Sequence, residues 1–322
     1  MNNIYFNGRC KALETKLLSL VQLNEIVKCK EVAEVVNLLN SYNFLKGESV
    51  ANFQDLLVLI EREEKEFLQF LKRTTPNPNF AKFFTLKYDY FNVESIYIAT
   101  KLEKDSYPTL LEGQLKIDTI IDLIKSQKYN LLSPQMENCL KYCDELFKKE
   151  QFTGFSIDTA FKKALYEEIA ESSKTKLLKK YTTFLIDMQN ISLASRLRDK
   201  TLFQTVRLRG GSLKDEVLFS LCTDEPAEIL MRTRNSDYTS AIKLIVSAWE
   251  KGETFFRFDY MFDCFPISFF DKYKYETVGY APYLRYCFLK ETELINLRII
   301  IEGLISNRNR QRISNELRRV YE

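Results

Sequence analysis

Residues 187–191 read Asp187-Met188-Gln189-Asn190-Ile191, and the same pattern occurs twice more in the chain. In each copy an acidic residue precedes an asparagine by three positions, and an apolar segment follows. The other two copies are Asp89-Tyr90-Phe91-Asn92-Val93 and Glu293-Leu294-Ile295-Asn296-Leu297. Self-similarity at a fixed period is the sequence signature of a repeat architecture. The chain is therefore predicted to contain three copies of one module.

A glycine marker supports the same period. Gly113-Gln114-Leu115 and Gly211-Ser212-Leu213 each follow an asparagine of the repeat at the same distance. The helix that a third copy of this marker would lead is missing after Asn296 because the chain ends there, so we expect its counterpart near the N-terminus, at Gly8-Arg9-Cys10 with a helix behind it. The predicted domains are three helical repeats, at residues 1–110, 111–208 and 209–322.

An acid and an amide three positions apart have a structural explanation. Positions i and i+3 of a helix are neighbours, so each copy places a carboxylate and an amide side by side. Such a pair can cap or cross-link backbone groups of a neighbouring helix, and we call it a staple. The alternative is that the three carboxylates act as acid/base groups or metal ligands, which requires them to converge. A repeat puts one carboxylate in each of three domains, and this favours the staple.

The hydrophobic pattern is helical throughout. Apolar residues recur at helical spacing at Phe53, Leu56, Leu57, Ile60, Phe67, Leu68 and Leu71. The same period occurs at residues 9–20, 31–39, 117–124, 157–181, 241–249 and 283–305. Only 9 glycines and 7 prolines interrupt the chain, and no long alternation typical of strands is present. We predict an all-α fold of three similar helical domains, arranged about a pseudo-threefold axis as a cone or ring with a central cavity.

The composition excludes several classes of enzyme. Histidine is absent, which removes Ser-His-Asp and Cys-His catalysis and His-ligated zinc. The 7 cysteines form no Cys-x-x-Cys pair and are predicted to be small buried residues of a reducing compartment. No phosphate-binding glycine loop is present. The sequence therefore predicts no catalytic residue, no cofactor and no metal site.

Neither nucleic acid nor the bilayer interior is an expected partner. Lys and Arg number 47 against 44 Asp and Glu, a net charge of +3. The aromatic run from Phe255 to Phe270, with Arg257 and Lys272 interleaved, resembles a base-stacking surface. Aromatic residues make up 13% of the whole chain, however, so core packing is favoured. No apolar stretch reaches the length of a bilayer span, and charged residues interrupt the first twenty positions, which predicts a cytoplasmic protein.

Several segments together resemble one known family. The run from Gly279-Tyr280-Ala281-Pro282-Tyr283 to Ile300 resembles the C-terminal signature of the C subunit of archaeal and bacterial V/A-type rotary ATPases, the counterpart of the eukaryotic d subunit. Tyr88-Asp89-Tyr90-Phe91-Asn92 is similar to the family's first-repeat marker, and Gly8-Arg9 to its N-terminal opening. The closing pattern Ile313-x-x-x-Leu317-x-x-x-Tyr321 is also similar. The resemblance covers essentially the whole chain.

The resemblance implies a funnel-shaped, non-catalytic adaptor of the central stalk. In this family the wide end rests on the rotor ring of membrane proteolipid subunits, and the central-stalk subunits D and F dock at the opposite side. Torque from ATP hydrolysis passes through the adaptor to drive H⁺ or Na⁺ transport, or in reverse during ATP synthesis. The implied location is peripheral to the membrane, through the ring.

Two alternatives remain open: an all-helical repeat scaffold for another cytoplasmic assembly, and a carboxylate-based hydrolase without histidine. One basic segment also allows two interpretations. Its arginines could contact acidic loops of ring or stalk, or anionic head groups, or they could form an ordinary solvated helix end, where cations are favoured by the helix dipole. They are Arg308, Arg310, Arg312, Arg318 and Arg319.

Overall fold

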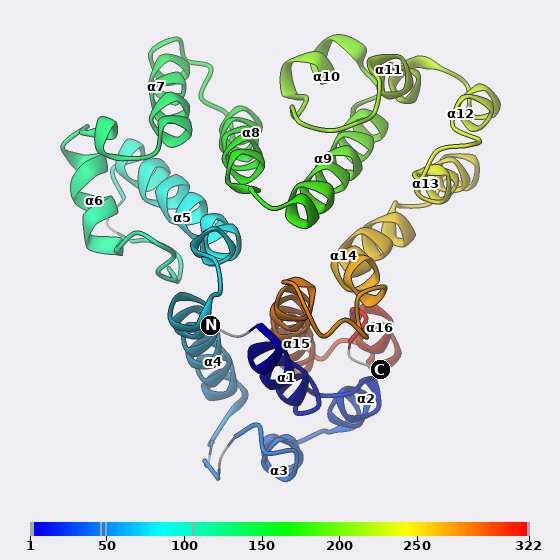
Figure 1. The fold of residues 1–322 in the computed structure, drawn as a ribbon. Helices are drawn as coiled ribbons and strands as arrows, with labels where there is room; N and C mark the ends of the chain where they lie inside the picture. Colours follow the sequence, from blue (N-terminus) through cyan, green and yellow to red (C-terminus); the bar gives the residue numbers. More distant parts are fainter. Residues whose placement is uncertain (1–2, 46, 49, 105, 321–322) are drawn as a thin grey trace. The chain divides into compact units, whose positions relative to one another are not determined.

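The computed structural model describes residues 3–45, 47–48, 50–104 and 106–320. These residues form helices joined by short connections, and no strand occurs among them (Figure 1). The predicted all-α class is confirmed. The chain forms two compact units, one made of Met1–Pro76 with Asp259–Glu322 and the other of Asn77–Phe258.

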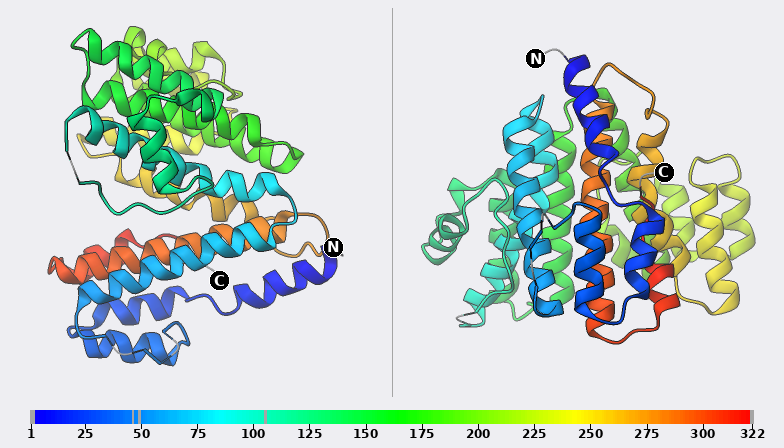
Figure 2. Two further views of the ribbon diagram at one scale, coloured as in Figure 1. Left: turned by 90° about the vertical axis from the view of Figure 1, so that its left-hand side faces the viewer. Right: turned by 90° about the horizontal axis from the view of Figure 1, so that it is seen from below.

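The unit that contains both chain ends is built around one long helix. Its helices are α1 (Asn3–Glu14), α2 (Leu20–Lys28), α3 (Val32–Ser41), α4 (Phe53–Thr74), most of α14 (Phe256–Asp271), α15 (Ala281–Ile305) and α16 (Arg310–Glu316). Helix α15 packs against α1, α2, α4 and α16 (Figure 2). It is therefore buried on nearly all sides, whereas α4 buries only its predicted stripe, including Leu56, Ile60 and Leu71.

The second unit contains the middle of the chain. Its elements are α5 (Pro78–Lys101), α6 (Ile117–Lys125), the 3₁₀ turn η1 (Tyr129–Leu131), α7 (Pro134–Lys148), α8 (Gly154–Ser172), α9 (Lys176–Leu197), α10 (Lys200–Val206), α11 (Asp215–Thr223), α12 (Pro226–Arg232) and α13 (Thr239–Lys251). Here the long helices α5 and α9 take the central places: α5 packs against α6 and α8, and α9 against α8, α10, α11 and α13 (Figure 1).

Two predicted helices are wrong because each is interrupted by a cap. The helix expected over 157–181 ends at Ser172, and α9 begins after Thr175, whose side chain accepts a hydrogen bond from the Leu178 backbone N–H at 3.2 Å. The helix expected over 9–20 ends at Glu14, and Ser19 caps α2. The hydroxyl side chains at these positions accept hydrogen bonds from backbone N–H groups, so each caps a new helix and the preceding helix does not continue.

The predicted closing helix is shorter than expected. Helix α16 ends at Glu316 and Leu317 is extended, while Tyr321 lies outside the described residues. The division into domains 1–110, 111–208 and 209–322 stays a prediction, and so does the funnel arrangement. None of the described helices has both the length and the apolar character that crossing a bilayer requires.

The cysteines and part of the aromatic run lie in the core. All 7 cysteines are buried with free thiols, as predicted. Phe258, Phe269 and Phe270 are also buried. The Phe270 ring stacks on Phe288 with 5.2 Å between centroids. Phe256 and Tyr260 are exposed, so core packing explains only part of the run.

Candidate functional site: three carboxylate staples

The first staple joins α5 to the segment that enters α6. The Asp89 carboxylate accepts hydrogen bonds from the backbone N–H groups of Gln114 at 2.9 Å and Leu115 at 3.0 Å. The Asn92 side chain donates to the carbonyl oxygen of Leu111 at 2.9 Å. A Cβ at Gly113 would collide with the Asp89 carboxylate, so the glycine of the marker is required by the close approach of the two segments.

The second staple makes the same contacts between α9 and the segment that enters α11. Asp187 accepts from the backbone N–H groups of Ser212 at 2.8 Å and Leu213 at 3.0 Å, and a Cβ at Gly211 would collide with it. Asn190 binds both the N–H and the carbonyl of Leu208, each at 2.9 Å.

A tyrosine completes the second staple. The hydroxyl of Tyr238 donates to Asp187 at 2.6 Å, and the Ser212 hydroxyl donates to the same oxygen at 2.6 Å. Burial and the hydrogen bond to Asp187 raise the pKa of Tyr238, because both disfavour a second negative charge at this place. The tyrosine therefore remains a hydrogen-bond donor at neutral pH.

The third staple is formed by the two ends of the chain. Asn296 on α15 binds the backbone N–H of Arg318 at 2.8 Å and its carbonyl at 3.0 Å. Glu293 accepts a hydrogen bond from the backbone N–H of Leu18 at 2.7 Å. Leu18 lies two residues before α2, as Leu115 does before α6. In the other two staples one continuous segment makes all of these contacts. Here the N-terminal and C-terminal parts of the chain share them.

The prediction that Gly8 is the third glycine marker is wrong. Gly8 lies inside α1, and no atom lies within 4 Å of where its Cβ would be. Counting from a glycine failed because the position that meets Glu293 belongs to the segment before α2. No glycine stands at that place.

The staple interpretation is confirmed by these contacts. Asp89, Asp187 and Glu293 are buried, with at most 2% of their surface exposed. Each carboxylate accepts at least one backbone N–H just before a helix, where the helix dipole also favours a negative charge. Hydrogen bonds to charged groups contribute about 1.5–3 kcal/mol each. Among the described residues, no three His, Cys, Asp or Glu side chains are grouped to hold a metal ion.

Buried ion pairs add to the third staple by fastening α1 to α15. Arg285 of α15 contacts Glu14 of α1 at 2.5 Å and Asp271 of α14 at 3.1 Å. Burial raises the pKa of Glu14, and the neighbouring Arg285 opposes that rise. Asn7 donates to the carbonyl oxygens of Thr277 and Gly279, each at 3.0 Å. The N-terminal helix is therefore held by several polar contacts.

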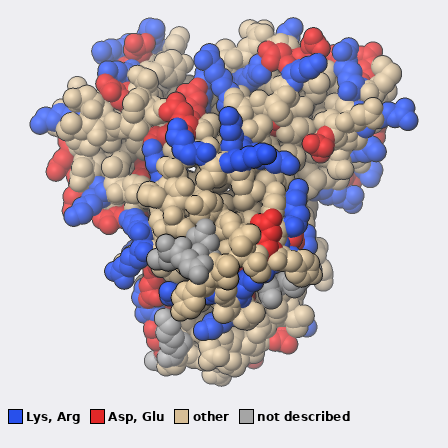
Figure 3. Space-filling view, in the orientation of Figure 1, with Lys and Arg blue, Asp and Glu red and all other residues tan. Residues whose placement is uncertain are grey.

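Most arginines of the C-terminal series form ion pairs with acidic side chains of the same chain. Arg308 and Arg312 both contact Glu316 at 3.2 Å, which is an ordinary exposed helix-end arrangement. Arg318 and Arg319 each pair with an acidic side chain of α14. On the face shown in Figure 3, basic and acidic side chains are interspersed and do not form one large patch of a single sign.

Comparison of the sequence with known proteins identifies the family of this chain. The family described as ATP synthase (C/AC39) subunit matches the chain over residues 6–316. The C subunit of the V-type sodium ATPase of Enterococcus hirae is 20% identical, with 98% of each chain covered. The C subunit of the A-type ATP synthase of Methanocaldococcus jannaschii is 22% identical over 94% of this chain and 83% of its own length. The C subunit of the A-type ATP synthase of Halobacterium salinarum is 24% identical over about half of each chain.

The family match contains the first two staples, Leu18, Glu293 and Asn296 of the third, and both unit boundaries, while Arg318 lies just beyond it. The relatives from Enterococcus hirae and Methanocaldococcus jannaschii align over nearly the whole chain, so the similarity is not confined to one module. The resemblance read from the short motifs is confirmed, and the chain belongs to the ATP synthase (C/AC39) subunit family of V-type and A-type ATPases.

Proposed function

We propose that this chain is the non-catalytic central-stalk adaptor of a V/A-type rotary ATPase. It couples the central shaft, subunits D and F, to the proteolipid ring, for ATP-driven transport of H⁺ or Na⁺ or for ATP synthesis. The observation that carries this proposal is the family match over residues 6–316, with relatives named as C subunits. Binding at the ring would make the protein cytoplasmic and peripheral to the membrane.

The internal structure of each unit suits a part that transmits torque. A coupler must pass a twisting load without deforming, and close-packed helices tied by buried polar contacts resist deformation better than flexible linkers do. The staples tie the central helices α5, α9 and α15 to the segments that enter α6, α11 and α2. The accepting carboxylates are buried, so water competes little for these acceptors.

The first experiment tests membership of the complex. An affinity-tagged copy of the full chain is expressed in its own organism, and membranes are solubilised in mild detergent. We expect the chain to co-purify with the ring proteolipid and with subunits D and F. If the chain elutes alone, or with an unrelated assembly, the scaffold alternative replaces the adaptor.

The second experiment tests coupling. In membranes that lack this chain, the catalytic sector is expected to hydrolyse ATP without ion transport, and purified chain added back should restore ATP-driven transport. The isolated chain should hydrolyse no ATP. Transport that continues without the chain would contradict the adaptor role, and turnover by the chain alone would favour the hydrolase alternative.

A further inference from the structure

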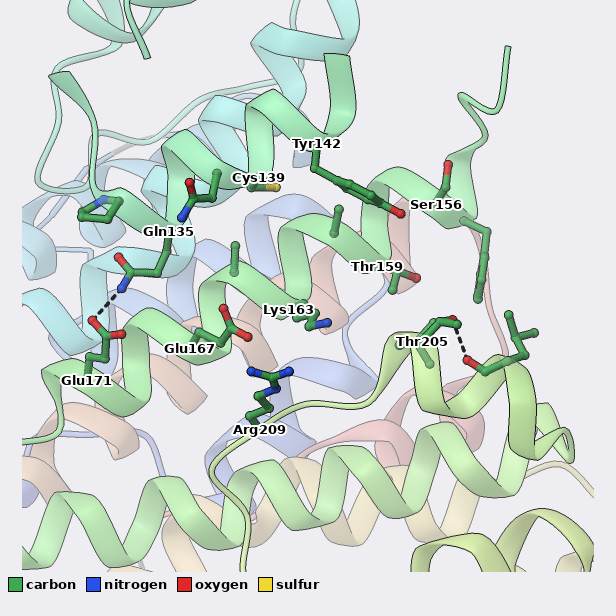
Figure 4. Close-up of a pocket in the computed structure, with 17 residues that line it drawn as sticks. Gln135, Cys139, Tyr142, Ser156, Thr159, Lys163, Glu167, Glu171, Thr205 and Arg209 are labelled. Atoms are coloured by element: carbon green, nitrogen blue, oxygen red, sulfur yellow. Dashed lines mark hydrogen bonds between the residues drawn. The ribbon is translucent and has the colours of Figure 1, made fainter. Parts of the chain in front are cut away.

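A groove of about 730 Å³ runs along α8 in the unit Asn77–Phe258 (Figure 4). Helix α7 forms one wall, and α10 with the segment after it forms the other. The residues of α8 that line the groove extend from Phe155 to Glu171. At 1.5 Å per residue this is about 24 Å of one helix face. The groove is therefore as long as a helical segment of about 16 residues.

Large apolar side chains are exposed on both sides of this groove. Tyr142 of α7, Phe155 of α8 and Leu202 of α10 all line it and have 51%, 50% and 38% of their surface exposed. Three such side chains around one concave surface are typical of an interaction site, whereas single exposed apolar residues are not. They would be covered by a ligand with an apolar face.

Two cations extend into the middle of the groove. Lys163 projects from α8 and Arg209 from the segment after α10, with the Glu167 carboxylate beside them (Figure 4). Among the described residues, neither cation has a carboxylate within ion-pair distance. At the far end Glu171 is already engaged, because Gln135 donates to it at 2.5 Å. A carboxylate supplied by a ligand would find its cationic partners, Lys163 and Arg209, in the middle of the groove.

The third staple contains an arginine at the position equivalent to Arg209, and that arginine pairs with a carboxylate. Asn296 binds the backbone N–H and carbonyl of Arg318 as Asn190 binds those of Leu208, so Arg319 corresponds to Arg209. Arg319 contacts the Asp271 carboxylate of α14 at 2.8 Å. Arg209 has no such carboxylate from the described part of its own chain.

We propose that the groove between α7, α8 and α10 binds an amphipathic helical segment of a partner polypeptide. The apolar face of this segment covers Tyr142, Phe155 and Leu202, and an acidic side chain on its edge pairs with Arg209 and Lys163. The length of the groove and its apolar rim favour a helix, as in other grooves that accept amphipathic helices. The proposal goes beyond coupling and applies whichever assembly the chain joins.

The first test uses the isolated full chain and a defined probe. The probe is a fluorescein-labelled 16-residue helical peptide with leucines on one face and glutamates on one edge, and its matched control has lysines in place of the glutamates. We expect the acidic peptide to bind the wild-type chain. The Lys163→Glu/Arg209→Glu variant should bind it about tenfold more weakly and should favour the basic peptide.

A matched control protein carries Lys125→Glu and Arg234→Glu, two exposed cations of the same unit that do not line the groove. It should bind the acidic peptide as the wild type does, and unaltered thermal unfolding shows that all variants are folded. Equal binding of both peptides by wild type and variant would overturn the proposal, because contact would then depend on apolar surface alone. Failure of the wild type to bind either peptide would overturn it too.

The second test uses the native complex. A photo-reactive p-benzoylphenylalanine replaces Phe155, and the cross-linked residue is identified by mass spectrometry. The proposal requires a partner helix with an acidic side chain, and reversing that acid to lysine should restore the assembly weakened by Arg209→Glu. A cross-link to a second copy of this chain, or no cross-link in an intact complex, contradicts the proposal. The peptide test does not depend on the complex, so the two proposals can fail separately.

Discussion

The backbone N–H of Leu18 donates a 2.7 Å hydrogen bond to the side chain of Glu293, 275 positions further along the chain. The equivalent bonds of the first two staples join residues only 26 positions apart. The Glu293 contact of the third staple is therefore made by the distant segment between α1 and α2, whereas the other two carboxylates are bound by a segment that lies close to them in the sequence. All three carboxylates nevertheless perform the same role.

Hydrogen exchange should distinguish the third staple from the others. Glu293 accepts one backbone N–H, whereas Asp89 and Asp187 each accept two, so fewer hydrogen bonds to the carboxylate must break before the third staple opens locally. We expect the amide of Leu18 to exchange about tenfold faster than those of Leu115 and Leu213. The measurement is hydrogen–deuterium exchange with mass spectrometry on the full chain. Equal or stronger protection at Leu18 would show that the ion pairs of α1 compensate fully.

Alanine at the marker glycines should destabilise the protein. Neither Gly113 nor Gly211 has a positive φ, so the collision of the new Cβ with the staple carboxylate is the main cost. Overpacking at a rigid contact costs about 1–3 kcal/mol. The control is Gly8→Ala, which places a methyl group in open space inside α1 and should stabilise by up to about 1 kcal/mol. Urea unfolding measures all three, and similar values for all would refute the requirement for glycine.

The staple asparagines should differ in their contribution to stability. Asn190 satisfies two backbone groups of Leu208, whereas Asn92 satisfies only the carbonyl of Leu111 and its own Oδ1 is buried without a partner among the described residues. Each buried group left unpaired costs about 1–3 kcal/mol. We therefore expect Asn190→Ala to lower the free energy of unfolding roughly twice as much as Asn92→Ala. The reverse order would argue against the hydrogen-bond explanation.

The free energy of unfolding should fall as the pH rises, because Glu94 loses its proton. Burial and the nearby Asp158 raise the pKa of Glu94 to about 7, against a partial opposing effect of Lys162. The folded chain therefore binds a proton more tightly than the unfolded chain, and the associated stability is lost as the pH rises from about 4.5 to 7.

The Glu94→Gln variant should remove this dependence. Because the side chain keeps part of its surface in water, we expect it to be more stable than the wild type by about 1–2 kcal/mol at pH 8. The difference should disappear near pH 4.5. Unfolding curves at both values provide the measurement, with the exposed Glu145→Gln as control. An unchanged difference between the two pH values would exclude Glu94 as the titrating group.

Charge reversal at the C-terminal arginines should weaken assembly more than stability. The pairs of Arg308 and Arg312 with Glu316 are exposed, and such pairs contribute only about 0–1 kcal/mol. We expect the triple variant with Glu at 308, 310 and 312 to lose co-purification with ring or stalk in a salt-dependent way while it unfolds at nearly the wild-type temperature. Unchanged co-purification at low salt would support the solvated helix end.

The repeat was predictable because close approach leaves a mark in the sequence. In the first two staples the aspartate approaches the neighbouring segment so closely that no Cβ fits beside it, and this places Gly113 and Gly211 at the same distance from their staples. The helical class follows from apolar spacing, and the family resemblance from the order of the motifs.

The remaining features depend on tertiary structure. The third staple could not be located because the segment it holds is divided between Arg318 and Leu18, and neither part carries the glycine. The groove was not predicted because the spacing of Phe155, Lys163 and Glu167 is also that of an ordinary solvated face. Only the packing of α7 and α10 beside α8 makes it a groove.

The contribution of both chain ends to one unit has a consequence for synthesis on the ribosome. The unit Asn77–Phe258 is complete before α15 has been translated. Helices α1 and α4, which pack against α15, emerge first and must wait for it. At about 5–20 residues per second this wait lasts roughly 10–50 s. The nascent N-terminal helices are thus candidates for chaperone protection during that interval, whereas the middle of the chain can already fold.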